Sequence, residues 1–66
     1  MRFADLKPQM RLHHGAYYPS EPAGWLTVTK VTADQWEAVY DQPVIGVGSV
    51  YTYLPEQAEF FRPLPL

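Results

Sequence analysis

The sequence predicts a single all-β domain of five short strands, curled into a small barrel. Seven prolines divide the 66 residues, and the longest stretch without one runs from Ala23 to Gln42, so no long helix fits between them. Apolar and polar residues alternate along several of the intervening segments, which is the period of a half-buried strand. Aromatic residues make up 15% of the chain, and such large rings can fill a small core.

Composition limits the class of protein further. The chain offers room for one domain over residues 1–66, and it has no cysteine, so disulfides and cysteine-based zinc sites are excluded. A hydrophobic content of 47% with only 18% charged residues argues against disorder. No apolar run approaches the roughly 20 residues of a membrane span, and the start lacks the pattern of a signal peptide. We therefore expect a cytoplasmic protein with no membrane association.

The N-terminal segment predicts a short turn and then the first strand. Residues 3–6 suit a 3₁₀ turn, and Pro8-Gln9 turns the chain into a strand from Met10 to His14. Alternate residues from Met10 should point inward and those from Arg11, including His13, outward. The adjacent histidines thus fall on opposite faces, which disfavours a shared metal ion, and the expected arrangement is one exposed and one partly buried ring.

The clearest strand is expected over Trp25–Thr32, which is rich in β-branched residues. Before it, residues 16–24 hold glycine, two prolines and two tyrosines, and they predict a long loop suited to binding. The alternation slips inside the strand, because Lys30 takes an inward position and Val31 an outward one. A bulge near Thr29-Lys30 would return Val31 to the core and help the sheet to curl.

The third strand should run from Trp36 to Asp41 after a hairpin turn at residues 33–35. Trp36, Ala38 and Tyr40 share one of its faces. Residues 42–48 then predict a loop with two glycines. Its Gly46-Val47-Gly48 opens no helix, so it predicts a turn rather than a dinucleotide site.

The C-terminal part completes the order of elements. Ser49–Leu54 predicts the fourth strand, and residues 55–59 suit one helical or 3₁₀ turn with proline at its first position. Residues 60–62 predict a short closing strand, which Pro63 and Pro65 prevent from extending as a pairing edge.

This order of strands, with a short turn before the last one, resembles the five-stranded SH3-like barrel. The opening DLKPQMRLHHG is also similar to the entry of KOW- and Tudor-type barrels. Gln9 stands where those barrels usually have glycine, so we expect an entry turn that tolerates a side chain. The resemblance rests on spacing and covers most of the chain.

Aromatic residues are the main candidates for a site. Tyr51 and Tyr53 lie two apart and share a strand face. On a surface, such rings could grip a proline-rich peptide, stack bases, enclose a methylated ammonium or seal a dimer; otherwise they fill the core. The proposed partner-binding residues are Tyr17, Tyr18, Trp25, Tyr51 and Tyr53. The proposed acidic rim consists of Glu21, Asp34, Glu37 and Asp41.

An enzymatic alternative comes from the fourth strand. Val50-Tyr51-Thr52-Tyr53 is similar to the Val-Gln-Ile-Tyr strand of plasmid-type (type II) dihydrofolate reductases, which are SH3-like chains that form tetramers. Here the Gln and Ile that contact ligands are missing, and the family's basic pore residue has no counterpart. Serine is present only at Ser20 and Ser49, in no nucleophile motif, so we expect neither enzymatic activity nor a cofactor.

The sequence therefore predicts a small non-enzymatic module that binds a protein partner or associates with itself. A chain of this size fits a phage- or plasmid-type accessory protein that acts on a host complex. The alternative is a nucleic-acid-associated barrel of KOW or Tudor kind. It is not favoured, because the net charge is −2 and the basic residues are scattered. The bases available to it are Arg2, Lys7, Arg11, Lys30 and Arg62.

Overall fold

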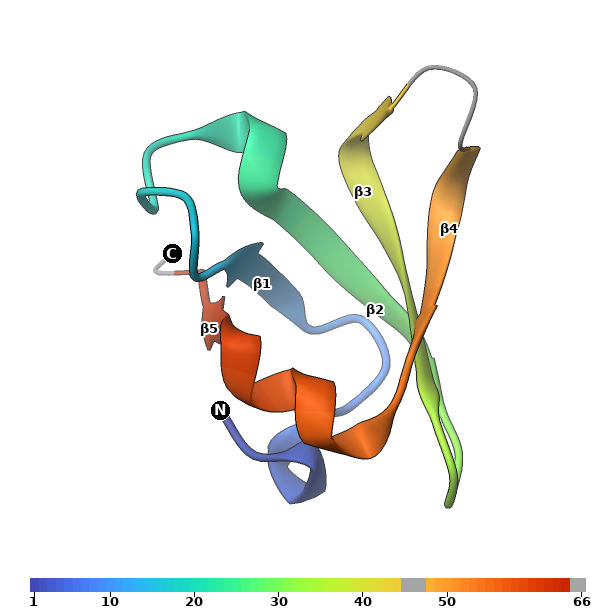
Figure 1. Cartoon of the computed structure of the whole chain (residues 1–66). Helices are drawn as coiled ribbons and strands as arrows, with labels where there is room; N and C mark the ends of the chain where they lie inside the picture. Colours follow the sequence, from blue (N-terminus) through green and yellow to red (C-terminus); the bar gives the residue numbers. More distant parts are fainter. Residues whose placement is uncertain (45–47, 65–66) are drawn as a thin grey trace.

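The predicted strands form one antiparallel sheet in the computed structural model, which describes residues 1–44 and 48–64. The sheet order is β4-β3-β2-β1-β5 (Figure 1). The strands are β1 (Arg11–His14), β2 (Trp25–Val31), β3 (Trp36–Val44), β4 (Gly48–Tyr53) and β5 (Phe61–Pro63). The 3₁₀ turns are η1 (Phe3–Asp5), η2 (Pro22–Gly24) and η3 (Pro55–Phe60). The all-β prediction is confirmed.

Some element boundaries differ from the prediction. Strand β3 continues to Val44 instead of ending at Asp41, and β4 begins at Gly48, so both strands extend into the predicted loop. Phe60 completes η3, which moves β5 one residue along the chain. The predicted turn at Gly46-Val47 and the role given to Pro65 lie outside the described residues.

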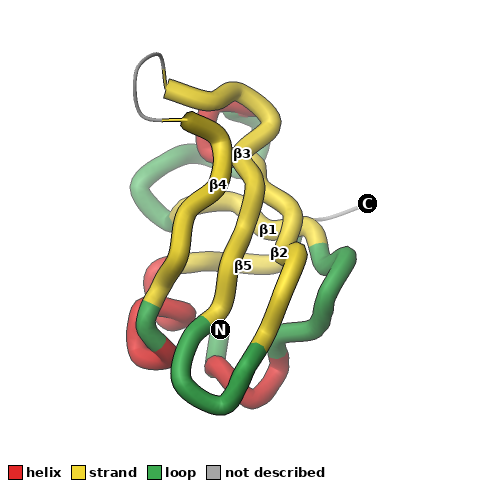
Figure 2. Tube along the Cα trace, turned by 90° about the vertical axis from the view of Figure 1, so that its right-hand side faces the viewer, coloured by secondary structure: helices red, strands yellow, loops and turns green. Residues whose placement is uncertain are grey.

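The sheet is strongly curled but open. Strands β4 and β5 are its two edges, and no ladder joins them within residues 1–44 and 48–64, so closure into a barrel is not confirmed. Turn η3 crosses from the end of β4 to the start of β5 and lies against η1 (Figure 1). In Figure 2, β1 and β5 run across the direction of β3 and β4, which gives the sheet a concave side. No helix in the described ranges is long and apolar enough to cross a bilayer.

The core fills this concave side. Its buried residues are Leu6, Leu12, Leu26, Val28, Trp36, Ala38, Ala58 and Phe61. Trp36 lies at the centre, with its ring stacked on Tyr53 at 4.6 Å and edge-on to Phe61 at 5.1 Å. Its indole Nε1–H donates to the carbonyl of Leu54 at 3.0 Å, so its one polar atom is satisfied in the core.

The predicted irregularity in β2 is present. The register of β2 against β3 shifts between Val28 and Lys30. As a result Lys30 is exposed, while Val31 packs against the core. The bulge thus resolves the conflict between the sequence pattern and the pleat.

The entry turn into β1 is the kind that glycine favours. The amide of Met10 donates to the carbonyl of Lys7 at 3.2 Å, with Pro8 and Gln9 at the central positions. Gln9 has φ 76°, the left-handed conformation that a type II turn requires at its third position. The expectation of a turn that tolerates a side chain is therefore wrong. Gln9 keeps the glycine-type conformation, and its amide is held by the carbonyl of Val28 at 2.7 Å.

Candidate functional site

A pocket of about 350 Å³ opens between the first loop and the concave faces of β3 and β4. It is lined by His14, Ala16, Tyr17, Ala23, Tyr40, Gln42 and Tyr51. Three of these seven residues are tyrosines, and none is Asp, Glu, Lys or Arg. The pocket is therefore an aromatic-walled cavity without a fixed counter-charge.

The sheet side of the pocket is a rigid pair of rings. Tyr40 lies in phase with Trp36 and Ala38 on β3, and its ring meets that of Tyr51 edge-on at 4.9 Å. The ring of Tyr53 stacks behind Tyr51 at 6.1 Å. The hydroxyl oxygens of Tyr40 and Tyr53 are hydrogen-bonded at 2.7 Å, which fixes the inner edge of the wall.

Burial disfavours the ionised form of these two hydroxyls. It raises the pKa of Tyr53 above its usual range, and the hydrogen bond with Tyr40 adds to the effect. Burial also raises the pKa of Tyr40. Tyr40 and Tyr53 therefore stay neutral to a higher pH than an exposed tyrosine does, and the Tyr40 hydroxyl already has a hydrogen-bond partner.

The opposite side of the pocket is the first loop, which Gly24 allows to fold back. A Cβ atom added at Gly24 would lie 2.8 Å from Cβ of Tyr17, so only glycine permits this approach. The amide of Tyr17 donates to the carbonyl of His14 at 3.0 Å. Tyr17 is thereby held over the pocket. The face of its ring that is turned away from Gly24 stays in solvent, and 41% of the residue is exposed.

His14 forms the floor of the pocket near β5. Its ring lies edge-on to Phe61 at 5.0 Å and to Tyr17 at 6.0 Å. Its Nδ1 accepts the amide hydrogen of Ala16 at 3.0 Å, so in the neutral ring Nε2 carries the hydrogen and is the donor. A residue that lines the pocket thus carries a ring N–H donor without a partner inside the first loop.

His13 lies on the other face of β1, as the alternation predicts, but it is only 6% exposed. The expected pair of one exposed and one partly buried histidine is therefore wrong, because one is buried and the other half-buried. On β1 its neighbours in register are Trp25 on β2 and Arg62 on β5, two large side chains. Within the described residues no three His, Asp or Glu side chains gather to hold a metal ion.

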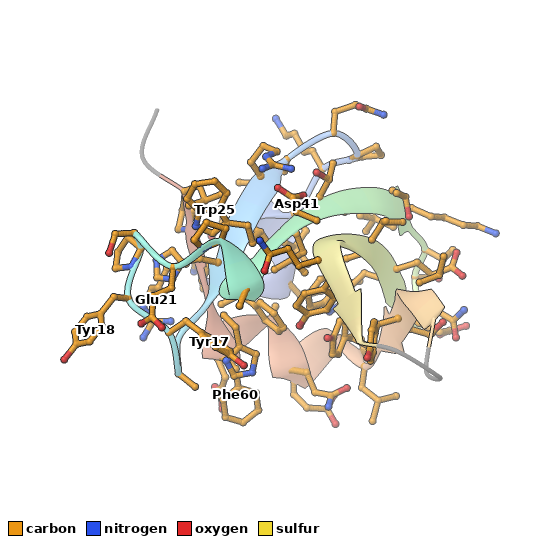
Figure 3. All side chains as sticks on the ribbon, turned by 90° about the horizontal axis from the view of Figure 1, so that it is seen from above. Tyr17, Tyr18, Glu21, Trp25, Asp41 and Phe60 are labelled. Carbon is orange, nitrogen blue, oxygen red and sulfur yellow. The ribbon has the colours of Figure 1, made fainter. Side chains whose placement is uncertain are left out.

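The predicted aromatic residues divide between the pocket, the core and the outer surface. Tyr17 and Tyr51 line the pocket, and Tyr53 supports it from the core. Tyr18 is 75% exposed and points away from the molecule in Figure 3. The indole Nε1–H of Trp25 donates to the carbonyl of Pro19 at 2.8 Å, and its ring lies on the side of the sheet away from Tyr17 (Figure 3).

Sequence reasoning missed five of the seven lining residues, namely Ala16, Ala23, Gln42 and two residues with rings, His14 and Tyr40. Both carried a usable signal, because Tyr40 alternates in phase with the buried Trp36, and His14 with the buried Leu12. Their inward direction pointed to core positions. In the structure both line the pocket instead.

None of the four acidic residues proposed as a rim lines the pocket. Asp41 lies on the outer face, where two oxygens accept from Arg11 at 2.7 and 2.6 Å (Figure 3). This hydrogen bonding with Arg11 lowers the pKa of Asp41. Glu21 accepts the amide hydrogen of Tyr18 at 2.9 Å. Asp34 lies in the turn between β2 and β3, and this turn is at the end of the sheet far from the first loop (Figure 1). Glu37 pairs in register with Lys30.

Two of the five basic residues proposed for a nucleic-acid surface form salt bridges with acidic residues. Arg11 is bound to Asp41, and Nε of Arg2 lies 3.7 Å from a carboxylate oxygen of Asp5.

Comparison with known proteins adds no functional assignment: no family model, no curated protein and no solved structure matches the chain.

Proposed function

We propose that this chain is a small non-enzymatic protein-binding module, an accessory to a larger complex, whose recognition site is the aromatic-walled pocket. The observation that carries the proposal is the convergence of Tyr17, Tyr40, Tyr51 and His14 around one cavity that no charged side chain lines. A pocket of about 350 Å³ is at the small end of ligand sites, so it would take one or two side chains of a partner.

The chemistry of the lining favours an uncharged ligand. A charged group entering the pocket would lose water without gaining a partner of opposite charge, which is costly. A phosphate would find no Lys or Arg in the lining, and an ammonium no Asp or Glu. Apolar groups gain from the ring faces instead, and the hydroxyls of Tyr17 and Tyr51, the Gln42 amide and the His14 ring can satisfy isolated carbonyl groups.

A proline-containing extended segment meets these requirements. Polyproline II backbone has no internal hydrogen bonds, so its carbonyls are available to donors such as His14 Nε2–H. Proline rings pack flat against aromatic side chains, and their restricted backbone loses little entropy on binding. We propose that a proline-containing segment of a partner protein occupies the pocket.

Titration with an oligoproline peptide, followed by backbone amide chemical shifts, tests the proposal. The expected shifts cluster at residues 14–17, 40–42 and 51. Tyr17→Ala should weaken binding at least about tenfold, as loss of a central aromatic anchor does. Tyr18→Ala is the matched control, since Tyr18 is the next residue of the same loop but outside the pocket lining. It should bind like the wild type.

Two results would count against the pocket as a site for a proline-containing segment. The first is binding that Tyr17→Ala and Tyr18→Ala weaken equally. The second is the absence of shifts with oligoproline while a peptide carrying trimethyl-lysine, or an oligonucleotide, produces them at the same residues. An oligonucleotide response that falls steeply with added salt would favour the nucleic-acid alternative. Turnover in a dihydrofolate-dependent cofactor-oxidation assay would favour the reductase alternative.

A further inference from the structure

We infer that β4 pairs antiparallel with β4 of a second copy of this chain, through the edge that it leaves free in the sheet. This inference is independent of the ligand proposed for the pocket. It depends on which backbone groups of β4 point outward, on the composition of the strand and on the position of Tyr51.

Hydrogen bonds between β2 and the segment just before β1 show in which direction the backbone groups of β2 point. The carbonyl of Val28 accepts from the amide of Gln9 at 2.7 Å, and the amide of Val28 donates to the carbonyl of Met10 at 2.8 Å. Both groups of Val28 therefore face the β1 side. Because directions alternate along a strand, the groups of Thr27 face β3.

The same alternation carries through β3 to β4. Thr27 pairs with Val39, so the groups of Val39 face β2 and those of Ala38 face β4. Ala38 pairs with Tyr51, so the amide and carbonyl of Tyr51 bond to β3. The amides and carbonyls of Val50 and Thr52 consequently point away from the sheet. Among the described residues no other segment accepts or donates a backbone hydrogen bond there.

The two edges of the sheet differ in how they resist pairing. Strand β5 is only Phe61–Pro63, contains Arg62 and Pro63, and precedes Pro65. Short length, charge and proline are the features that keep an edge from pairing with another chain. Strand β4 has none of them: its sequence is Gly-Ser-Val-Tyr-Thr-Tyr, and Val50 on it is 58% exposed.

A second copy is the occupant that suits this edge. An antiparallel strand can pair with itself about a twofold axis, and β4 carries no charge that would be repelled by its own copy. With the axis at Tyr51, the outward amide and carbonyl of Val50 meet those of Thr52 on the other copy. The two Tyr51 side chains then lie opposite each other on the concave face, where they join the two aromatic pockets into one surface.

Sedimentation equilibrium of the full chain over a wide concentration range tests the inference. We expect the wild type to form a dimer. Thr52→Pro removes an outward amide without touching the ladder to β3, and it should raise the dimer dissociation constant at least about tenfold. Thr52→Val, which keeps the amide and a β-branched side chain, should dimerise like the wild type. Trp36 fluorescence reports whether each variant is folded.

Val50→Lys keeps the inference testable if Thr52→Pro fails to fold. A lysine on an edge strand opposes pairing, so this variant should be monomeric at concentrations where Val50→Thr is a dimer. Tyr17→Ala lies outside β4 and should leave dimerisation unchanged, which separates this test from that of the pocket. A monomeric wild type would overturn the inference, even if β4 bound a foreign extended peptide. A dimer that is insensitive to both Thr52→Pro and Val50→Lys would place the interface elsewhere.

Discussion

Replacing Gln9 by glycine should stabilise the protein. Gln9 holds φ 76° in the type II turn, a conformation that costs an L-residue with a Cβ atom about 1–2 kcal/mol. Glycine removes this cost but adds about 0.4–1 kcal/mol of backbone freedom to the unfolded chain. The side chain of Gln9 is exposed, and its hydrogen bond to Val28 uses the backbone amide, so glycine loses neither packing nor that bond. The midpoints of these two ranges give an expected net gain of about 0.8 kcal/mol.

Urea unfolding followed by the fluorescence of the buried Trp36 measures this difference. For a domain of this size the same gain corresponds to a rise in Tm of about 3–6 °C. Gln9→Ala is the control, because it shortens the side chain but keeps the Cβ atom, and its stability should equal that of the wild type. Gln9→Asn should lie between alanine and glycine, since asparagine tolerates this conformation better.

The order of stability among these variants tests whether the turn is strained. If Gln9→Gly is no more stable than Gln9→Ala, the backbone at this turn is not strained as the φ angle implies. If all variants lose stability equally, the glutamine side chain makes a stabilising contact. Either outcome would refute the reasoning from the turn.

Two further predictions concern side-chain pairs. Asp41→Asn should cost about 0.5 kcal/mol at pH 7, a small value because the bidentate pair with Arg11 is about one-third exposed. Hydrogen bonding with Arg11 lowers the pKa of Asp41 below its unfolded value near 4, so this stability is present above about pH 4 and is lost as the pH falls further. Urea unfolding at pH 7 and at pH 2.5 should therefore differ between the two proteins only at pH 7. Tyr53→Phe should cost about 1 kcal/mol at pH 7 because the Tyr40 hydroxyl loses its partner. Burial raises the folded pKa of both tyrosines, so the wild type loses stability above about pH 10, where the unfolded chain ionises. With one such group removed, Tyr53→Phe should lose stability less steeply in urea titrations at increasing alkaline pH, and an equal slope would contradict the assignment.

Local patterns were enough to predict most of the fold. Proline spacing and two-residue alternation located the strands within a few residues, and the misplaced Lys30 predicted the bulge in β2. The closure of the sheet could not be predicted in this way. Whether two edge strands meet depends on the accumulated curl of the whole sheet, and the pattern within each strand carries no information on that sum.

The site was predictable only in part, because the path of the first loop decides which rings face inward. Tyr17 and Tyr18 are adjacent and chemically alike. Tyr17 folds over the pocket because Gly24 leaves room for it, whereas the amide of Tyr18 is held by Glu21 and its ring stays in solvent. Such differences come from contacts between residues several positions apart. Alternation predicted the shared face of Tyr51 and Tyr53, since that face follows from a single strand.

The hydroxyl pair of Tyr40 and Tyr53 connects the pocket to the centre of the molecule. Tyr40 lines the cavity, Tyr53 stacks on Trp36, and these three rings form one unbroken series of contacts. A molecule that displaced Tyr40 would disturb this hydrogen bond and, through Tyr53, the surroundings of the indole. Trp36 is one of two tryptophans, so in a Trp25→Phe variant the intrinsic emission should act as a built-in sensor of occupancy, and ligands could be screened without a label.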